Sequence, residues 1–306
     1  MVSSFPKKIL IILGPTASGK SHLAQKIAAE FNGVIINADS MQIYKNFPVL
    51  SAMPSAFEMS QLPHKLYGIL DWLKDDACSA AQWAEKAYKV IEQTWEKDQL
   101  PIVVGGTGFY IKALMEGLSD IPSVPKEVRQ FISSSLEVES NRLKLYSHLQ
   151  QQDPLSASKI SIRDTQRLTR ALEVLLYTNK PVSFWQKRRN PSSLTEDNFH
   201  ILSLLPERLI LYERINRRTV KLLEEGALEE VKIFKQDRGI KGPKKIPLIG
   251  FEEISQFQEG LIPYEEALQK IQQKTRNYAK RQITWLRHQI RPDFIITGIS
   301  NQTFLG

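Results

Sequence analysis

Cysteine is almost absent from this sequence: Cys78 is the only one among 306 residues. A single cysteine excludes a disulfide or a cysteine metal cluster within the chain, and it fits a reducing compartment such as the cytoplasm. Long apolar runs are also missing. The run after Lys7 and Lys8 covers only Ile9 to Leu13. It is too short for a signal peptide or a membrane span, and we interpret it as a core strand.

Acidic residues are outnumbered, because 33 Asp and Glu face 41 Lys and Arg, which gives a formal net charge of +8. This surplus is typical of proteins with an anionic partner such as a nucleic acid, although many basic enzymes bind none. Hydrophobic residues make up 42% of the chain, an ordinary share for a globular protein. The length is sufficient for one full core and a second lobe or insertion.

The most informative motif is a glycine-rich loop, Gly14-Pro15-Thr16-Ala17-Ser18-Gly19-Lys20-Ser21. It follows the Ile9 to Leu13 run and precedes a helical pattern from His22 to Phe31, which is the strand, loop and helix context of a phosphate site. Backbone N–H groups and the helix N-terminus of such a loop converge on phosphate oxygens. Lys20 supplies an ammonium for the terminal phosphate, and the Ser21 hydroxyl is placed to bind Mg²⁺.

Small and polar residues follow two further apolar runs, as Asn37-Ala38-Asp39-Ser40 after Val34 to Ile36 and as Gly105-Gly106-Thr107-Gly108 after Ile102 to Val104. Such runs predict buried parallel strands, whose carboxyl ends collect ligands. Asp39 is a candidate general base or Mg²⁺ partner, and capping of the next turn is the structural alternative. Thr107 is a candidate ligand-binding hydroxyl, unless its loop is a plain turn.

The remaining pattern predicts an α/β fold with an insertion. A helix is expected over Ser79 to Lys97, and further strands over His200 to Leu204 and Asp293 to Thr297. The middle of the chain lacks strand patterns and is bounded by Pro122 and Pro125 at its entry and by Asn190-Pro191-Ser192-Ser193 at its exit. We therefore predict a P-loop parallel-sheet core with C-terminal helices over 1–120 and 199–306, and an inserted helical lobe over 121–198.

Two predicted helices carry basic faces. Between Arg163 and Tyr177, one face holds Arg163, Arg167 and Arg170, and the opposite face holds Leu168, Leu172 and Leu175. Between Lys274 and His288, an apolar stripe (Ala279, Ile283, Leu286, Ile290) faces away from Lys274, Tyr278, Arg281, Trp285 and His288. Arginines and aromatic rings in this arrangement suit RNA phosphates and splayed bases. Solvated arginines and aromatic rings packed against another lobe are the alternatives.

Seven segments together resemble the tRNA dimethylallyltransferases, also called isopentenyl-diphosphate:tRNA transferases. They are GPTASGKS (14–21), NADSMQIY (37–44), VVGGTGFY (103–110), KALMEGLSDIP (112–122), DTQRLTRALEV (164–174), RINRR (214–218) and YAKRQITWLR (278–287). The resemblance runs in order from Gly14 to Arg287. The family often has Lys-Pro where this chain has Met53-Pro54, and a base where this chain has Glu252.

The resemblance implies transfer of a dimethylallyl group from dimethylallyl diphosphate to the exocyclic amine of the adenosine at tRNA position 37, with release of diphosphate. It implies a monomer that requires Mg²⁺. Asp39 would accept the amine proton, Thr107 would orient the amine, and Arg214 and Arg218 would lie near the diphosphate. The residues expected to contact tRNA are Asp39, Ser40, Met41, Gln42, Thr107, Arg129, Arg163, Asp164, Thr165, Gln166, Arg167, Arg281 and Trp285.

Two other functions remain open from the residues alone. A P-loop small-molecule kinase would use the same phosphate loop, but Asp39 would then have to serve as both metal ligand and base. An RNA-binding ATPase switch without transfer chemistry would fit the charge, but it leaves the strand-end residues Asp39 and Thr107 without a role.

Overall fold

The computed structural model describes residues 7–297 except 76, 189–191, 193 and 239–245. The chain divides into two compact units, one formed by Met1–Met115 with Leu194–Gly306 and the other by Glu116–Ser193. The prolines predicted to open the second lobe lie in an irregular segment before its first helix. Of the predicted exit segment, Asn190, Pro191 and Ser193 lie outside the described residues.

The first unit is built on a sheet of six strands in the order β3-β2-β4-β1-β5-β6, and every pairing is parallel. The strands are β1 (Ile9–Leu13), β2 (Gly33–Asn37), β3 (His64–Lys65), β4 (Leu100–Gly105), β5 (Phe199–Leu204) and β6 (Phe294–Ile296). The central strands are almost completely buried because helices cover both faces, which is why their sequences are continuous apolar runs. The predicted parallel α/β core is confirmed, whereas β3 is too short and polar to be foreseen.

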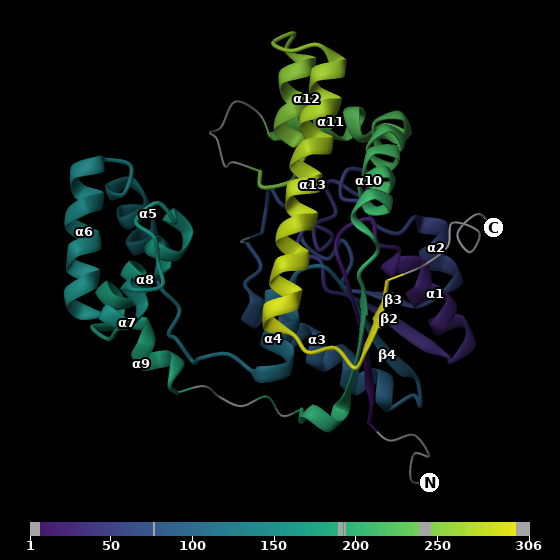
Figure 1. Cartoon of the computed structure of the whole chain (residues 1–306), viewed down its shortest axis with the longest axis horizontal. Coiled ribbons are helices and arrows are strands. Elements are labelled where there is room, and N and C mark those ends of the chain that lie inside the picture. Colours follow the sequence, from purple (N-terminus) through teal and green to yellow (C-terminus); the bar gives the residue numbers. More distant parts are fainter. Residues whose placement is uncertain (1–6, 76, 189–191, 193, 239–245, 298–306) are drawn as a thin grey trace. The chain divides into compact units, whose positions relative to one another are not determined.

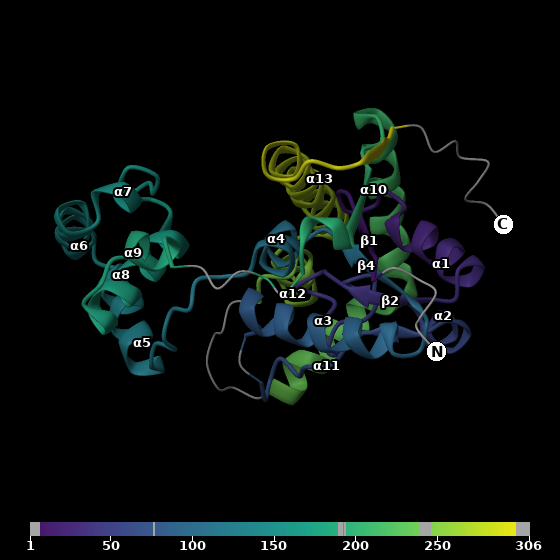
Figure 2. The ribbon, with the colours of Figure 1, turned by 90° about the horizontal axis from the view of Figure 1, so that it is seen from below.

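Helices α1 (Lys20–Glu30) and α3 (Ala80–Trp95) cover opposite faces of this sheet, as seen in Figure 2. The reason is topological: the chain crosses from β1 to β2 through α1 and returns from β3 to β4 through α3, in the opposite direction across the sheet, and such crossovers are almost always right-handed. Helix α1 packs Ala24 and Ala28 onto Ile35. Helix α3 buries Trp83, whose indole Nε1 donates to the Asn37 carbonyl at 2.8 Å. Two shorter helices, α2 (Ala56–Gln61) and α4 (Gly108–Glu116), follow β2 and β4.

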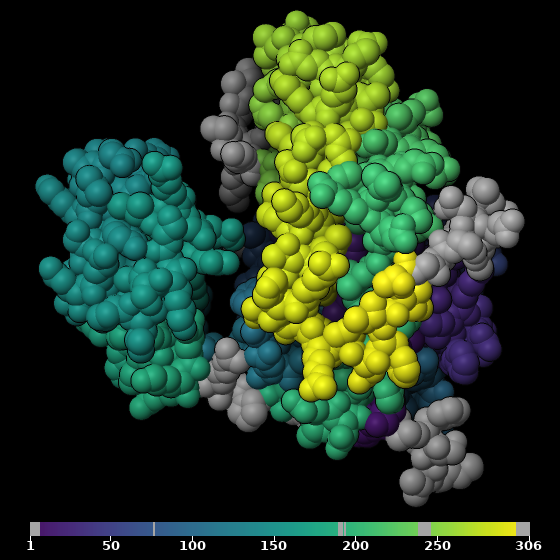
Figure 3. All heavy atoms as spheres, in the orientation of Figure 1, coloured from purple at the N-terminus to yellow at the C-terminus, as the bar shows by residue number. Residues whose placement is uncertain are grey.

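Four helices complete the first unit: α10 (Arg208–Leu222), α11 (Leu228–Arg238), α12 (Phe251–Gln258) and α13 (Tyr264–Gln289). Helix α13 runs beside α10 (Figure 1) and forms an exposed ridge in the space-filling view (Figure 3). Helices α11 and α12 share a second apolar core with α13 and with the loop after β2, centred on Phe47, Leu50, Phe234, Phe251 and Ile271. A π-turn, Leu223–Ala227, joins α10 to α11.

The second unit is helical, and its described residues form no strand. Its helices are α5 (Lys126–Ser135), α6 (Glu139–Gln152), α7 (Pro154–Ala157), α8 (Thr165–Thr178) and α9 (Val182–Gln186). The apolar face predicted for α8 is confirmed: Leu168, Leu172 and Leu175 are buried in this unit's core. The predicted helix start at Arg163 is wrong, because the Asp164 carboxylate caps the helix and accepts from Arg167 N at 3.2 Å.

None of the described helices is long and apolar enough to cross a membrane.

Candidate active site

The loops after three neighbouring strands form the candidate active site. Parallel register aligns Leu13 with Gly105 and Asn37 with Val104, so the ends of β1, β4 and β2 lie side by side. From β1 the chain crosses toward β2, whereas from β4 it continues, by way of the second unit, to β5 on the other side of β1. The gap between β1 and β4 is therefore a topological switch point, where open α/β sheets bind ligands.

The glycine-rich loop has the conformation that a phosphate cradle requires. Gly19 has φ +96°, a left-handed conformation that favours glycine, and α1 begins at the next residue, Lys20. The Lys20 ammonium folds back over the loop and donates to the Pro15 carbonyl at 2.7 Å. The Ser18 hydroxyl is buried inside the loop and has no hydrogen-bond partner among the described residues. Ser21 lies exposed in the first turn of α1, beside the position of an incoming phosphate.

Positive charge is concentrated beside this loop. Burial lowers the pKa of the Lys20 ammonium to about 7; Asp39 opposes that shift and Arg218 adds to it. Burial also lowers the pKa of the Arg218 guanidinium, and Asp39 again opposes the shift. Two cations therefore share one carboxylate in a partly closed site, and a bound anion would relieve their mutual repulsion. Arg218 thus lies within electrostatic reach of Lys20, and its contact with a diphosphate stays a prediction.

Asp39 lies at the end of β2 in a fixed conformation. Its backbone N–H donates to Asn37 Oδ1 at 2.8 Å, and its own Oδ1 accepts from Met41 N at 2.9 Å. Oδ1 of Asp39 therefore caps the following turn, which is the structural alternative given for this residue. The other oxygen, Oδ2, accepts no hydrogen bond from the described residues, and the side chain is only half-buried.

Thr107 ties the β4 loop to the β2 loop. Its Oγ1 accepts from Ser40 N at 2.9 Å and lies 3.3 Å from Ser40 Oγ, and its backbone N–H donates to the Ala38 carbonyl at 3.1 Å. The hydroxyl thus fixes the Asp39 loop and lies close to it. The prediction that places Thr107 beside Asp39 agrees with this geometry, but its contact with a ligand stays a prediction.

Three tyrosines lie within electrostatic reach of the Asp39 carboxylate. Burial raises the pKa of Tyr67, Tyr110 and Tyr278, and in each case the negative charge of Asp39 adds to the shift. Tyr110 is buried, whereas Tyr67, Tyr278 and Asp39 itself are half-buried, so the carboxylate is partly shielded from water. In such surroundings an ionised group acts more strongly on a bound ligand than it does in solvent.

Other predicted site residues of the first unit have structural partners. The Gln42 side-chain amide donates to the carbonyls of Ser51 and Ala52, so its Nε2 holds a loop in place. Trp285 lies against the backbone of α4: a Cβ added at Gly108 would meet its ring at 2.1 Å. The Trp285 ring is therefore packed against protein, which agrees with the structural alternative to stacking on RNA bases.

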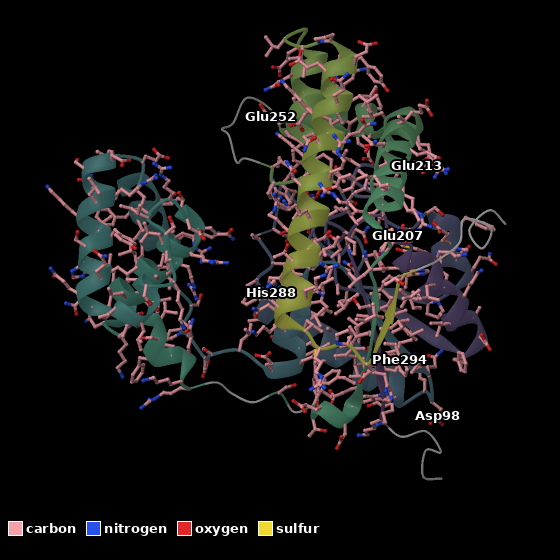
Figure 4. All side chains as sticks on the ribbon, in the orientation of Figure 1. Asp98, Glu207, Glu213, Glu252, His288 and Phe294 are labelled. Carbon is pink, nitrogen blue, oxygen red and sulfur yellow. The ribbon has the colours of Figure 1, made fainter. Side chains whose placement is uncertain are left out.

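Three further predicted residues of this unit remain accessible to different degrees. Arg214 and Met41 are half-buried, whereas Arg281 is exposed near the ring of Tyr278. The paired-arginine motif also contains Arg217, which forms an exposed ion pair at 3.4 Å with Glu213. Figure 4 labels Glu213 on α10. Arg217 therefore belongs to the surface of α10.

The predicted RNA-contacting residues between 129 and 167 belong to the second unit, where the arginines are exposed. Arg163 lies in the turn before α8, and Arg167 pairs with Asp164 at 3.5 Å. The flanking Thr165 and Gln166 are also exposed. These residues form a polar surface around the N-terminus of α8.

Sequence reasoning missed a buried acid in this unit. Glu173 is 3% exposed, and it accepts from Arg129 at 3.3 Å and from Arg170 at 3.4 Å. Two of the arginines that the sequence marks as basic surface are thus held by one carboxylate. Its position on the buried side of α8, between Leu172 and Val174, was the available signal.

A second residue that sequence reasoning missed is Gln282, in the middle of the apolar stripe of α13. It is 6% exposed, and its amide joins the phosphate loop to the β4 loop through Thr16 N at 2.8 Å and the Gly106 carbonyl at 3.0 Å. An uncharged polar residue between Ala279 and Leu286 was the available signal.

The chain resembles proteins of known family over nearly its whole length. The model of the IPP transferase family matches residues 42–289. A tRNA dimethylallyltransferase of Allorhizobium ampelinum is 40% identical over 282 residues, 92% of this chain and 91% of that protein.

Two solved structures are also similar. The full-length tRNA isopentenylpyrophosphate transferase of Bacillus halodurans has a TM-score of 0.66 at 31% identity, covering 97% of this chain and 93% of that one. A eukaryotic dimethylallyltransferase described as acting on tRNA has a TM-score of 0.76 at 29% identity, covering 92% of this chain and 70% of that one. With its strand-end phosphate loop, Asp39 and Thr107 in place, this chain belongs to the IPP transferase family.

Proposed function

We propose that this protein transfers the dimethylallyl group of dimethylallyl diphosphate to the exocyclic amine of the tRNA adenosine on the 3′ side of the anticodon. The observation that carries the proposal is the pairing of a cationic phosphate loop with the open carboxylate oxygen of Asp39 on adjacent strand ends. Membership of the family supports the same reaction, because relatives are named tRNA dimethylallyltransferases.

The donor diphosphate would bind in the glycine-rich loop. Backbone N–H groups at the start of α1 point toward the loop, and Lys20 and Arg218 supply two positive charges next to it. Diphosphate would displace the Lys20 ammonium from the Pro15 carbonyl, the one hydrogen-bond acceptor of that ammonium among the described residues. The same cations then stabilise the negative charge that grows on the leaving diphosphate.

The transfer step makes one bond and breaks another. The adenine amine nitrogen attacks the first carbon of the dimethylallyl group, and the bond from that carbon to the diphosphate oxygen breaks. The bonding electrons leave with diphosphate, and the amine proton passes to Oδ2 of Asp39. An aromatic amine is a weak nucleophile, so a positioned carboxylate that takes its proton accelerates the step.

The residues fit a Mg²⁺ ion that is held mainly by the substrate. No group of three or more His, Cys, Asp or Glu side chains converges in the described part of the chain. Mg²⁺ typically keeps several waters and binds through substrate phosphates with one or two protein oxygens, and the exposed Ser21 hydroxyl beside the loop is such an oxygen. When bound, the ion would neutralise part of the diphosphate charge.

Transfer RNA would be held by both units. The net charge of +8 and the exposed arginines around the start of α8 suit a phosphate backbone, and the target adenine has to leave its stack to reach Asp39. The proposed enzyme acts as a monomer in the cytoplasm, where its substrate is found. Binding of tRNA by the helical unit follows from this charge and from the resemblance of DTQRLTRALEV to the family.

One incubation tests the proposal against both alternatives. The protein is mixed with Mg²⁺, bulk tRNA and dimethylallyl diphosphate labelled in the dimethylallyl group. We expect label to enter tRNA and to be recovered on an adenosine next to the anticodon. Consumption of ATP without transfer of label to tRNA would instead favour the kinase or the ATPase switch.

A further inference from the structure

Gln282 connects loops that lie far apart in the sequence. Its Oε1 accepts from Thr16 N in the phosphate loop at 2.8 Å, and its Nε2 donates to the Gly106 carbonyl at 3.0 Å. In the sequence, Gln282 on α13 is 266 residues from Thr16 and 176 residues from Gly106. The amide accepts one hydrogen bond and donates another, so replacing it leaves Thr16 N and the Gly106 carbonyl without this partner.

The fit around this amide is close. A Cβ added at Gly106 would lie 2.2 Å from Gln282 Nε2, so a side chain at residue 106 would displace the amide. The helix before it is fixed as well, because Ala279 is buried against Leu211 and Ile215 of α10. The amide therefore has a defined position set by α10 and α13, not by the loops that it joins.

This contact completes a chain of hydrogen bonds from the phosphate loop to Asp39. Gln282 fixes the β1 loop to Gly106, and the next residue, Thr107, fixes the β4 loop to Ser40, which adjoins Asp39. The separation between a bound diphosphate and the base consequently depends on both links. Reactions of this kind are sensitive to it, since misplacement by about 1 Å can cost about 100-fold in rate.

We propose that Gln282 is a positioning residue that clamps the phosphate loop to the Thr107 loop and thereby sets the distance between the diphosphate and Asp39. It does not touch the substrate. The clamp rests on the proposed function for its effect on rate, but its effect on the two loops does not depend on any activity.

Gln282→Met tests the clamp, since methionine keeps the length of the side chain and removes both hydrogen bonds. Gln272→Met is the matched control: it also lies on α13 and also loses a bond to a backbone carbonyl, that of Asn216 on α10 at 3.2 Å. Hydrogen exchange is measured by mass spectrometry on peptides covering 14–19 and 105–109. We expect faster exchange in both loops for Gln282→Met and in neither for the control. Unchanged exchange in either loop of Gln282→Met overturns the clamp.

The rate effect is measured in a single turnover at saturating tRNA and dimethylallyl diphosphate. We expect transfer by Gln282→Met to be slower than transfer by the wild type by about 10-fold to 100-fold. The number of binding sites for inorganic diphosphate, and the affinity of those sites, should stay within about threefold of the wild-type values. A rate within that threefold margin, or a rate loss matched by an equal loss of diphosphate sites, contradicts positioning. Failure of the wild type to transfer label would reject the proposed function and leave the exchange result to decide on the clamp.

A second variant covers the case in which Gln282→Met does not fold. Gly106→Ala places a methyl group where the amide now lies, and the same two measurements apply. If the glycine acts through the clamp, adding Gly106→Ala to a folded Gln282→Met protein slows transfer little further, because the contact is already lost. Losses that multiply in the double variant contradict the proposal.

Discussion

Arginine is used differently in the two units of this chain. In the first unit, burial lowers the pKa of Arg218, which lies within the influence of Lys20 and Asp39. In the second, the Arg167 side chain is 71% exposed and pairs with Asp164 at the rim of α8. A half-buried cation that shares one counter-ion suits a ligand that enters the site, whereas an exposed cation suits a large anionic surface. We therefore expect chemistry and RNA affinity to be separable in this protein.

The largest expected effect is the loss of the base. Asp39→Asn keeps an oxygen for Met41 N but removes the negative charge and the ability to take up a proton, and we expect the transfer rate to fall by about 10²-fold to 10⁴-fold. Binding of tRNA, measured by filter retention, should stay close to that of the wild type. Asp39→Ala serves as a second variant that also removes the contact with Met41. Transfer within about threefold of the wild type in both would remove Asp39 from the mechanism.

The next largest expected effect is on donor binding, and it should differ between two adjacent arginines on α10. Loss of a charge-assisted contact to diphosphate costs about 1.5–3 kcal/mol, so Arg218→Ala should raise the KM for dimethylallyl diphosphate by about 10-fold to 100-fold. Arg217→Ala is the control, because Arg217 forms only an exposed pair with Glu213 in the described structure. Steady-state kinetics at saturating tRNA measure both. Equal KM changes in the two variants would show that the site does not distinguish them.

A smaller expected effect is the uptake of a proton when diphosphate binds. Burial lowers the pKa of Lys20 to about 7, and a bound diphosphate favours its charged form, so binding takes up a proton when the pH lies above 7. The affinity for diphosphate is therefore expected to weaken as the pH rises beyond that value. Calorimetry at pH 8 in buffers of different ionisation enthalpy counts the protons. The wild type should take up about one proton more than Lys20→Met, and equal uptake would argue against a role for the ammonium.

The smallest effects belong to the exposed arginines. Each phosphate contact that is lost reduces the slope of log affinity against log salt by about one, so Arg163→Ala and Arg167→Ala should each flatten the salt dependence of tRNA binding by that amount. The exposed Lys144→Ala on α6 is the control for charge alone. Titrations at several salt concentrations give the slopes. A slope that does not change would identify the α8 arginines as solvated surface.

The parts of the molecule that follow from local sequence were predictable. The apolar runs of β1, β2 and β4 are buried on both faces, and parallel strands bring their carboxyl ends together, so Asp39 and Thr107 could be placed beside the phosphate loop. The start of α8 was misplaced at Arg163, although Asp164 followed by a helical pattern is a cap signal.

The remaining parts depend on distant contacts. Gln282 meets Thr16 and Gly106 only because α13 packs beside α10, and no local pattern contains that packing. Glu173 likewise pairs with Arg129 across two helices, α8 and α5. Periodicity indicates that a polar residue lies on a buried face, but its partner is defined only by the tertiary structure.

Single-turnover transfer from a preformed enzyme–tRNA complex tests the separation of chemistry and RNA affinity most directly. Labelled dimethylallyl diphosphate is added at saturation to complexes of wild type, Asp39→Asn and the double variant Arg163→Ala/Arg167→Ala, with enough protein to saturate tRNA in each case. From this separation we expect a loss of transfer rate of about 100-fold or more for Asp39→Asn and an unchanged transfer rate for the arginine variant. An arginine variant that stays slow when tRNA is saturated, or an Asp39→Asn protein that transfers at the wild-type rate, would contradict it.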